Sequence, residues 1–517
     1  MSEFTFDVNV AESVLDVAIV GSGFAGIGMA IRLTQSGIEN FRILEQSADI
    51  GGTWRDNTYP GAACDVPSHL YSFSFAPNPR WSRMFAEQKE IHGYLKDCVD
   101  RFNLREKTSF NTTIVSAKFD AGTNLWTLTT YAGRTLKARL VVMATGALNR
   151  PAYPDIPGME DFRGRVFHTA EWDHSYALEG KKVAVIGTGA SAIQVVPAIA
   201  PKVKSLTLYQ RTPAWVFPKF DRPIKSLEQR LYRLLPVTQK LFRGAIYAAG
   251  EAATPLFLKP SALSKMAESI GRRHLSRYVQ DPELREKLTP TYALGCKRIL
   301  LSNDYYPALA RENVSVVSCG VDKIEGRTIY ASDGSKQVVD AIVLATGFKV
   351  PVASAPFDII GLNGKVLQDD WKEGAEAYKG MTVTGYPNML FTMGPNTGPG
   401  NTSVIFYIES QLRYLLNYVK EVLAFDDASL ELKQEKQTSF NEMIQTRMQN
   451  TAWTSGCHSW YLTPSGKNTT LWPGFSMEYR LITRQFDRES YVMHLATSGT
   501  VAESDQSLNR LFEPALA

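Results

Sequence analysis

The chain has 517 residues, of which 44% are hydrophobic and 21% are charged, and its formal net charge is +4. This composition is that of a globular protein, and the length suffices for about two to four domains. So small a net charge on so long a chain does not indicate a nucleic-acid-binding protein.

The N-terminal stretch MSEFTFDVNVAES is acidic and lacks the apolar core of a signal peptide. No apolar run in the sequence is long enough to span a bilayer. The cysteines are scattered, odd in number and without a CxxC motif, which argues against a disulfide framework, a zinc site and a thioredoxin-like redox pair. They are Cys64, Cys98, Cys296, Cys319 and Cys457. We therefore expect a protein of the reducing cytoplasm without a metal site.

The first predicted unit is a strand, a glycine turn and an amphipathic helix, in VAIVGSGFAGIGMAIRL. Gly21, Gly23 and Gly26 have the G-x-G-x-x-G spacing, which allows a tight turn, close approach of a pyrophosphate and close packing of helix on strand. The N–H groups at the start of the helix then face the phosphates. The next strand, FRILE, ends in Glu45, whose carboxylate would bind ribose hydroxyls and repel a 2′-phosphate. This site is therefore predicted to hold the adenosine half of FAD or NAD.

The segment that follows, GGTWRDNTYPGAACDVPSHLYSFSF, is rich in glycine and aromatic residues, which is unusual for a surface loop. We expect contacts with the same cofactor from Gly52, Thr53, Trp54 and Tyr71, with the aromatic side chains packing on its planar ring. Asp65 is the only acid in the second half of the segment. By itself this residue is equally consistent with a turn or cap.

A second glycine fingerprint lies in KKVAVIGTGASAIQVV. Its predicted nucleotide-binding residues are Gly187, Gly189, Ser191 and Ala192. The strand after this helix ends in Arg211, followed by Thr212, where the first site has an acid. Because an arginine there can bind a 2′-phosphate, we expect this site to prefer NADPH. Two sites of opposite charge predict two dinucleotides, with hydride passing from NADPH to a flavin.

The two fingerprints lie about 165 residues apart, which predicts an α/β fold with two Rossmann-like domains. The apolar strands LVVMATG and AIVLATGF favour parallel sheets, and the proline-rich RPAYPDIPG is typical of a linker. Residues 221–290 show helical periodicity with many basic side chains, and we interpret them as a helical insertion with a solvated face. The expected parts are an FAD-binding domain at 1–150 and 385–517, the latter with a mobile loop, and an NADP-binding domain at 151–220 and 291–384.

Between the fingerprints lies FRGRVFHTAEWD. It matches the type I Baeyer–Villiger monooxygenase fingerprint F-x-G-x-x-x-H-x-x-x-W-[P/D] at Phe162, Gly164, His168, Trp172 and Asp173. From about residue 17 to residue 475 the chain resembles this family of class B flavoprotein monooxygenases. The related flavin-containing monooxygenases usually have another aromatic residue at the position of Trp172.

The resemblance implies FAD and NADPH as cofactors, and ketones, with thioethers as further substrates. It implies insertion of one oxygen atom beside a ketone carbonyl, through a C4a-peroxyflavin, to give an ester or lactone. Arg298, in GCKRIL, would be the catalytic arginine that stabilises negative charge on oxygen, and Asp65 would hold it by a charge-assisted hydrogen bond. Lys297 would join Arg211 at the 2′-phosphate. Trp460, in SWYLTPSGK, would belong to a loop that closes over NADP.

His168 and Trp172 would couple domain movement to catalysis, although a lone histidine is more often structural. Two positions depart from the common pattern of the family. Asp173 stands in place of the usual proline, and Ala63 stands where many members have arginine. The second departure lies beside Asp65 and therefore alters the edge of the flavin site or the substrate pocket.

Three alternatives remain open at this stage. The first is a flavin-containing monooxygenase that oxygenates nitrogen or sulfur. The second is an NADPH-dependent flavin reductase, which the absence of a CxxC motif disfavours. The third is a redox sensor that binds both nucleotides without turnover. The identity of the ketone and the oligomeric state do not follow from the sequence.

Overall fold

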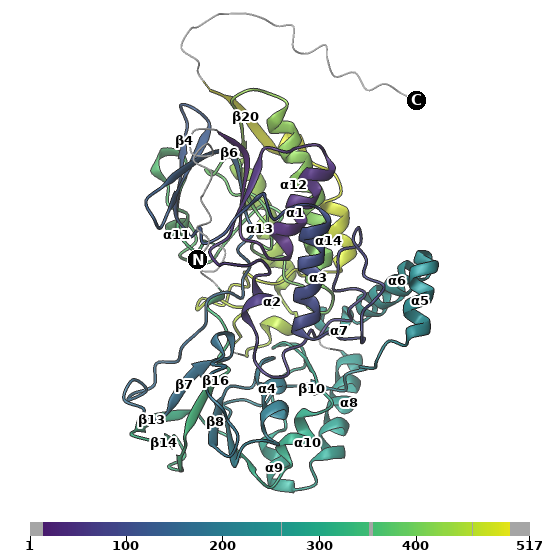
Figure 1. The fold of residues 1–517 in the computed structure, drawn as a ribbon, viewed down its shortest axis with the longest axis vertical. Helices are drawn as coiled ribbons and strands as arrows, with labels where there is room; N and C mark the ends of the chain where they lie inside the picture. Colours follow the sequence, from purple (N-terminus) through teal and green to yellow (C-terminus); the bar gives the residue numbers. More distant parts are fainter. Residues whose placement is uncertain (1–13, 260, 351–354, 458, 497–517) are drawn as a thin grey trace, which may run out of the picture.

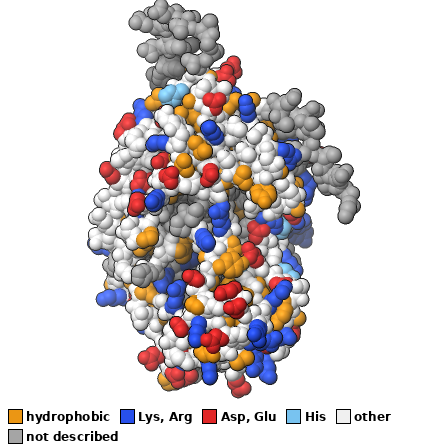
Figure 2. Space-filling model, turned by 90° about the vertical axis from the view of Figure 1, so that its left-hand side faces the viewer, with side chains coloured by type: hydrophobic (Ala, Val, Ile, Leu, Met, Phe, Trp, Pro, Cys, Tyr) orange, Lys and Arg blue, Asp and Glu red, His pale blue; other side chains and the backbone are white. Residues whose placement is uncertain are grey.

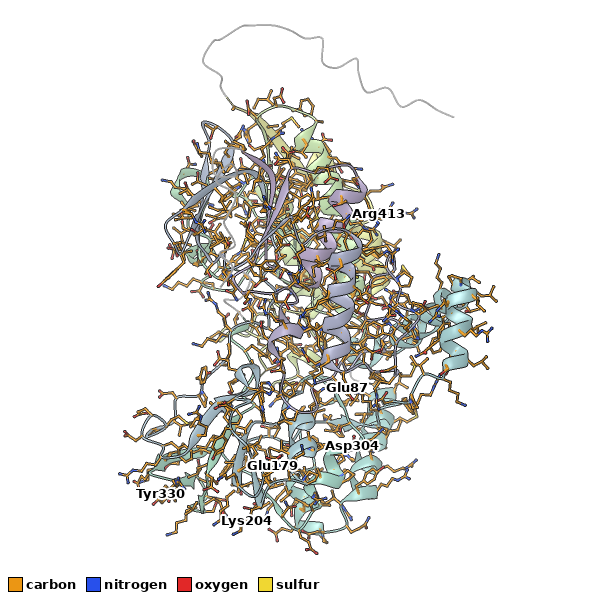
Figure 3. All side chains as sticks on the ribbon, in the orientation of Figure 1. Glu87, Glu179, Lys204, Asp304, Tyr330 and Arg413 are labelled. Atoms are coloured by element: carbon orange, nitrogen blue, oxygen red, sulfur yellow. A yellow bond between two sulfur atoms is a disulfide. The ribbon has the colours of Figure 1, made fainter. Side chains whose placement is uncertain are left out.

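A computed structural model describes residues 14–259, 261–350, 355–457 and 459–496. The strands of two large sheets lie in separate parts of the molecule, one above the other in Figure 1. Glu179, Lys204 and Tyr330 lie on the lower part and Arg413 lies on the upper part (Figure 3). On the face in Figure 2, acidic and basic side chains are interspersed, as the small net charge suggests.

The upper sheet has the strand order β17-β4-β5-β6-β1-β2-β3, with β18 also paired to β6. Its strands are β1 (Leu15–Val20), β2 (Phe41–Leu44), β3 (Thr108–Ser109), β4 (Ile114–Asp120), β5 (Leu125–Thr130), β6 (Thr135–Met143), β17 (Asp358–Ile360) and β18 (Met389–Phe391). β1 pairs in parallel with β2 and β6, whereas β4, β5 and β6 are antiparallel neighbours. The sheet is therefore mixed, with its parallel part around the first glycine fingerprint.

Helices α1 (Phe24–Gln35), α3 (Gln88–Arg101) and α12 (Val404–Leu423) lie together beside this sheet (Figure 1). The interior-facing sides of these helices and the apolar residues of β1 form one large core. Gly28 permits the close approach of α12, because a Cβ there would lie 2.8 Å from a side-chain carbon of Leu412. The C-terminal third of the chain thus covers the first nucleotide-binding unit.

The lower sheet has the order β12-β9-β8-β16-β7, and every pair in it is parallel. Its strands are β7 (Arg165–His168), β8 (Lys182–Ile186), β9 (Ser205–Tyr209), β12 (Val314–Val317) and β16 (Ala341–Leu344). β8, β9 and β16 are apolar runs because both faces of the sheet are covered. The other strands are β10 (Val216–Phe217), β11 (Leu300–Leu301), β13 (Val321–Glu325), β14 (Thr328–Ala331), β15 (Lys336–Val338), β19 (Ala428–Leu432) and β20 (Tyr491–Leu495).

The segment between β10 and β11 is helical. It contains α5 (Ser226–Leu234), α6 (Pro236–Ala252), α7 (Pro255–Leu258), α8 (Ala262–Tyr278) and α9 (Pro282–Lys287). α5 and α6 project at the right-hand edge of the molecule (Figure 1). The remaining helices are α2 (Thr53–Asp56), α4 (Ala192–Ile199), α10 (Tyr305–Leu309), α11 (Leu367–Asp370), α13 (Gln434–Met448) and α14 (Ser476–Ile482).

One expected boundary needs correction. We expected residues 291–384 to belong with the second nucleotide-binding unit, yet β17 pairs in parallel with β4 of the upper sheet. The chain therefore returns to the upper sheet before residue 358, not after 384. The three residues of β17 carry no glycine turn or long apolar run, so no local pattern marks the return. Within the described residues, no helix combines the length and hydrophobicity needed to cross a bilayer.

Candidate active site

The two glycine turns have the same construction. Gly21 and Gly187 have φ values of +105° and +119°, and a Cβ at either would lie within 2.6 Å of the carbonyl oxygen of an alanine, Ala144 or Ala345. These alanines begin the two Ala-Thr-Gly motifs that end β6 and β16. Each turn is therefore pressed against the end of a neighbouring parallel strand, which only glycine allows.

The other fingerprint residues divide into two groups. A Cβ on Gly23 or Gly189 would meet nothing within 4 Å, so backbone at these positions is open to the cleft. Gly26 does not line the cleft, and a Cβ there would lie 1.9 Å from the carbonyl oxygen of Gly21. Ala192 is likewise buried away from it. The open glycines suit phosphate contact, and the closed positions suit helix packing.

Both turns open onto one cleft of about 1560 Å³. This volume exceeds the roughly 300–1,000 Å³ of ordinary small-molecule sites. Most of the predicted cofactor-binding residues line it: Gly21, Gly23, Glu45, Gly52, Thr53, Trp54, Tyr71, Gly187, Gly189, Ser191, Arg211, Thr212, Lys297 and Trp460. Arg298 and Asp65 line it as well. The cleft thus has the size and the paired turns that two dinucleotides require.

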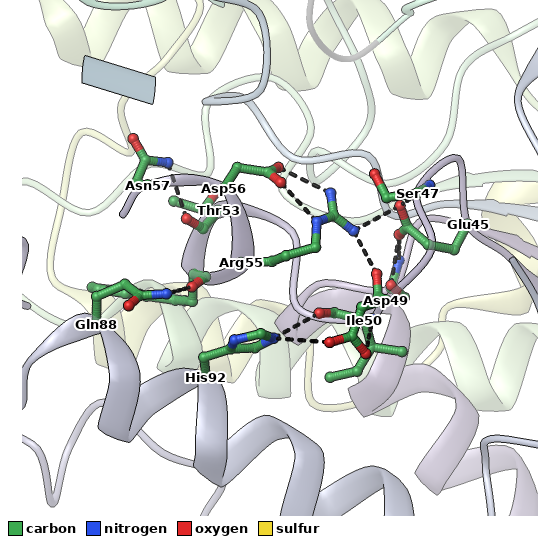
Figure 4. Close-up of polar contacts among 12 residues, drawn as sticks. Glu45, Ser47, Asp49, Ile50, Thr53, Arg55, Asp56, Asn57, Gln88 and His92 are labelled. Carbon is green, nitrogen blue, oxygen red and sulfur yellow. Dashed lines mark hydrogen bonds and ion pairs between the residues drawn. The ribbon is translucent and has the colours of Figure 1, made fainter. Parts of the chain in front are cut away.

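Glu45 lies at the end of β2 with its side chain fixed by protein donors (Figure 4). One carboxylate oxygen accepts hydrogen bonds from the backbone N–H and hydroxyl of Ser22, at 3.0 and 2.6 Å. The other accepts from the backbone N–H of Ser47 and from Arg55, both at 2.9 Å. Arg55 also binds Asp56. The sequence pattern located Glu45 but gave no signal for its partner Arg55.

Trp54 and Tyr71 form one aromatic wall. The indole N–H of Trp54 donates to the hydroxyl of Tyr71 at 3.1 Å, and their rings meet edge to face at 5.5 Å. Gly52, with φ +52°, brings this segment against Gly23, since a Cβ would lie 3.3 Å from the Cα of Gly23. The predicted aromatic residues are therefore held beside the first glycine turn.

Arg298 and Asp65 form an ion pair on the wall of the cleft. Two guanidinium nitrogens donate to one carboxylate oxygen, at 2.6 and 3.1 Å. Burial raises the pKa of the Asp65 carboxyl, but Arg298 and then Lys219 lower it more, so it lies below its usual value. The negative charge of Asp65 raises the pKa of Arg298. The pair therefore stays ionised throughout the neutral range.

Tyr461 is a neighbour of this pair that sequence reasoning missed. Tyr461 is buried and directly follows Trp460 in the chain. Burial raises the pKa of Tyr461 to about 12, with Arg298 opposing that shift. A neutral phenol thus lies within the electrostatic range of Arg298. Trp460 itself is 46% exposed and its ring lies 4.5 Å from that of Tyr461.

A second basic group on the cleft wall consists of Arg211 and Lys297. Arg211 follows β9, and burial lowers the pKa of Lys297, an effect to which the charge of Arg211 contributes. Among the described residues, no ion pair joins either side chain to a carboxylate. Thr188 donates to the carbonyl oxygen of Thr212 at 3.1 Å and fixes the turn beside them. Two cations without acidic partners suit a phosphate group.

A clamp joins the Asp65 segment to α4. Gln194 of α4 accepts from the hydroxyl of Tyr59 at 2.8 Å and donates to the carbonyl oxygen of Ala63 at 2.9 Å. A Cβ on Gly61 would lie 2.6 Å from the carbonyl oxygen of Gln194. The backbone of Ala63, the residue that we expected to alter the flavin edge or the substrate pocket, is thus held by α4 of the second glycine unit. No sequence signal pointed to Gln194.

His168 and Trp172 do not line the cleft. His168 is fully buried at the end of β7, and its Nδ1 accepts from the backbone N–H of Ala170. Its ring contacts those of Tyr153 and Phe348, which do line the cleft. Burial lowers the pKa of His168 and favours the neutral ring. This placement fits a packing role between the proline-rich linker and the end of β16.

One expectation about the cysteines was wrong. Cys296 and Cys457 form a disulfide, with their Cα atoms 6.2 Å apart, whereas Cys64, Cys98 and Cys319 are free. The partners are 161 residues apart in sequence, so no local spacing marks them. The bond links the segment of Arg298 to the segment of Trp460. In the part of the chain that the structure describes, no group of three or more His, Cys, Asp or Glu is arranged to hold a metal ion.

Comparison with known proteins gives consistent results. Residues 18–239 match the family model described as pyridine nucleotide-disulphide oxidoreductase. A Baeyer–Villiger monooxygenase of Pseudomonas aeruginosa is 48% identical over 493 residues, which are 95% of this chain and 93% of that protein. A Baeyer–Villiger monooxygenase of Streptomyces coelicolor is 49% identical over 92% of each chain.

Solved structures agree. The cyclohexanone monooxygenase from Rhodococcus sp. Phi1 bound to NADP+ has a TM-score of 0.83 and 28% identity, over 94% of this chain and all of the other. An oxidised steroid monooxygenase bound to NADP also has a TM-score of 0.83, with 29% identity over 93% of this chain and 99% of the other.

Proposed function

The chain belongs to the Baeyer–Villiger monooxygenases, and we propose which of its residues perform the reaction. The protein is an FAD- and NADPH-dependent enzyme that uses O₂ to insert one oxygen atom beside a ketone carbonyl. The product is an ester or a lactone. Bound FAD, once reduced by NADPH, would supply the activated oxygen.

Arg298 is the proposed catalytic residue. Attack on a ketone carbonyl places negative charge on the substrate oxygen, and a fixed guanidinium is charged at every working pH. The observation that carries this assignment is the ion pair with Asp65 on the cleft wall. Asp65 is a positioning residue, because both of its hydrogen bonds are to the Arg298 guanidinium.

The nucleotides are assigned by charge. FAD fits the turn of Gly21 and Gly23, with Glu45 at its ribose end and the wall of Trp54 and Tyr71 beside it. NADPH fits the second turn, where Arg211 and Lys297 would hold the 2′-phosphate. On this assignment the FAD-binding and NADP-binding domains correspond to the upper and lower sheets, and residues 221–290 are an insertion within the NADP-binding domain.

Trp460 and Tyr461 are proposed to exclude water from the reacting groups. Both line the cleft, and Tyr461 is buried there. His168 and Trp172 are proposed to transmit movement between the linker and the cleft, since His168 contacts Tyr153 on one side and Phe348 on the other. Because NADPH is the reductant, we propose the cytoplasm as the place of action.

Thioethers are proposed as further substrates of the same site. Oxygen transfer to sulfur forms no tetrahedral adduct with an anionic oxygen, so it needs Arg298 less than ketone oxidation does. The Arg298→Ala variant should therefore lose ester formation, whereas its sulfoxide formation should fall less. It should still bind FAD, which flavin absorbance measures. Arg327→Ala, which removes an exposed arginine paired with Asp340, is the matched control. Ester formation at the wild-type rate in Arg298→Ala would contradict the assignment.

A further inference from the structure

The hairpin of α5 and α6 carries apolar side chains on its solvent-facing side. Six of them, which we call the apolar ridge, are Leu227 (77% exposed), Leu231 (43%), Leu234 (66%), Leu235 (53%), Val237 (58%) and Leu241 (69%). In α5 they recur at i, i+4 and i+7, and in α6 at i and i+4, so each set lies on one helix face. The shorter side chains of Ala245 and Ala248 continue the α6 face and are also exposed.

The opposite face of the hairpin is anchored to the body of the protein. Gln229 donates to the carbonyl oxygen of Trp81, and the buried Gln239 donates to His69 and to the carbonyl oxygen of Asn78. Tyr232 is also buried there. The ridge therefore faces solvent because the other side is fixed. A helix that is apolar on both sides is normally covered on both.

Single exposed leucines are common on protein surfaces, but a contiguous row of large ones marks an interaction site. The hairpin also projects from the molecule (Figure 1), which leaves the ridge accessible to a flat or extended partner. The charges beside the ridge indicate which kind of partner fits it.

The ridge is flanked by basic side chains. Lys225, Arg230, Arg233 and Lys240 are all exposed. The only acid between residues 225 and 241 is Glu228, and both of its oxygens accept from Arg222, at 2.7 and 2.8 Å. The uncompensated charge around the ridge is therefore positive.

Two candidate occupants differ in charge. A second copy of the chain, related by a two-fold axis, would bring one basic rim against another, with Glu228 already engaged. An anionic phospholipid surface satisfies both features, since it accepts apolar side chains at the acyl boundary and basic ones at the headgroups. We propose that the α5–α6 hairpin docks the enzyme onto a bilayer surface rich in anionic phospholipids.

α6, which carries two of the six ridge residues, ends beside a segment of the cleft wall. Just beyond the C-terminal end of α6, Asn401 donates to the hydroxyl of Thr254, and Thr402, which follows Asn401, lines the cleft wall. A docked hairpin would thus place an apolar reservoir within one helix length of the cleft. The docking does not depend on the proposed catalytic roles. Only the advantage that this placement would give for apolar ketones depends on the proposed function.

The test is sedimentation of the FAD-loaded enzyme with vesicles of phosphatidylcholine alone or mixed with phosphatidylglycerol. We expect about tenfold more binding to the anionic vesicles, and its loss at about 1 M salt, where the screening length is about 3 Å. Substitution of Leu227, Leu234 and Leu241 by Gln should reduce that binding about tenfold. Substitution of Arg230, Arg233 and Lys240 by Gln should remove the preference for anionic vesicles.

The matched control replaces three exposed apolar residues of α8, Leu263, Met266 and Ile270, by Gln and should bind as the wild type does. FAD content and the thermal midpoint verify that each variant is folded; all the substituted side chains are exposed. Equal binding to neutral and anionic vesicles, or unchanged binding by the ridge variant, would overturn the proposal. So would a concentration-dependent dimer in light scattering that the ridge substitutions abolish, because it would assign the surface to a second copy.

Discussion

Arg298 donates two hydrogen bonds, at 2.6 and 3.1 Å, to a single carboxylate oxygen of Asp65, which precedes it by 233 residues. Asp65 follows the first glycine fingerprint and Arg298 follows the second. The pair therefore joins the two nucleotide-binding halves at the wall of their common cleft. Because each charge stabilises the other, the guanidinium is held at this wall.

Asp65→Asn should lower kcat for ketone oxidation by about 10- to 100-fold, because the side chain keeps its shape but loses the charge that positions Arg298. KM for NADPH should stay within about twofold of the wild-type value. Because Arg298 lowers the pKa of Asp65, Asp65 keeps its charge as the pH falls from neutral to the usual carboxyl range. The wild-type enzyme should therefore lose no activity through protonation of Asp65 over this range. Steady-state kinetics across pH measure all three effects, and a wild-type kcat in Asp65→Asn would exclude a positioning role.

Lys297→Ala and Arg211→Ala should each raise KM for NADPH by about 10- to 100-fold, the range of one charge-assisted hydrogen bond. KM for NADH should change little, since NADH has no 2′-phosphate. The ratio of kcat/KM for the two coenzymes in each variant gives the result. A variant that weakens NADPH and NADH equally would indicate general damage to the cleft.

Acid should destabilise the fold through His69. Burial and the charge of Arg243 lower the pKa of His69 to about 4, from the 6.5 of an unperturbed ring. The contribution of neutral His69 to the free energy of unfolding is fully present above pH 6.5. It is lost as the pH falls towards 4, because only the unfolded chain then binds the proton. The loss amounts to at most about 3 kcal/mol. In His69→Asn the free energy of unfolding, from denaturant titrations, should fall less between pH 7 and pH 5; an unchanged slope would contradict this.

The disulfide should be detectable in two ways, by the number of reactive thiols and by the free energy of unfolding. Alkylation of the unfolded, unreduced protein should modify three of the five cysteines, and all five after reduction. Removal of the 161-residue link, by reduction or by Cys457→Ser, should lower the free energy of unfolding by about 2–5 kcal/mol. Reductant should not affect Cys457→Ser further. Five reactive thiols before reduction would show that the bond does not form.

The local parts of the site could be predicted from the sequence because their causes are local. Gly21 and Gly187 are required by turns that press against alanine carbonyls, and such steric demands leave a readable spacing. Glu45 and Arg211 follow from their distance along the chain after each turn. The pairing of Arg298 with Asp65 had no such local sign and followed from the resemblance to a family.

Apart from Arg55, which lies ten residues from its partner Glu45, the contacts that could not be predicted from the sequence join distant segments. Gln194 meets Ala63 across 131 residues, and Cys296 meets Cys457 across 161. β17 was assigned to the wrong sheet because three residues carry too little pattern to identify a partner strand. Each of these contacts arises when folded units meet, so no spacing along the chain records it.

The enzyme is expected to transfer one oxygen atom from O₂ to a ketone in this cleft. The most direct measurement incubates the purified enzyme with NADPH, a panel of cyclic, linear and aryl ketones, and ¹⁸O₂, with product mass and NADPH consumption recorded together. We predict an ester or lactone that carries one ¹⁸O atom and forms in proportion to NADPH consumed. NADPH consumption that yields only hydrogen peroxide or the alcohol across the whole panel would contradict the account.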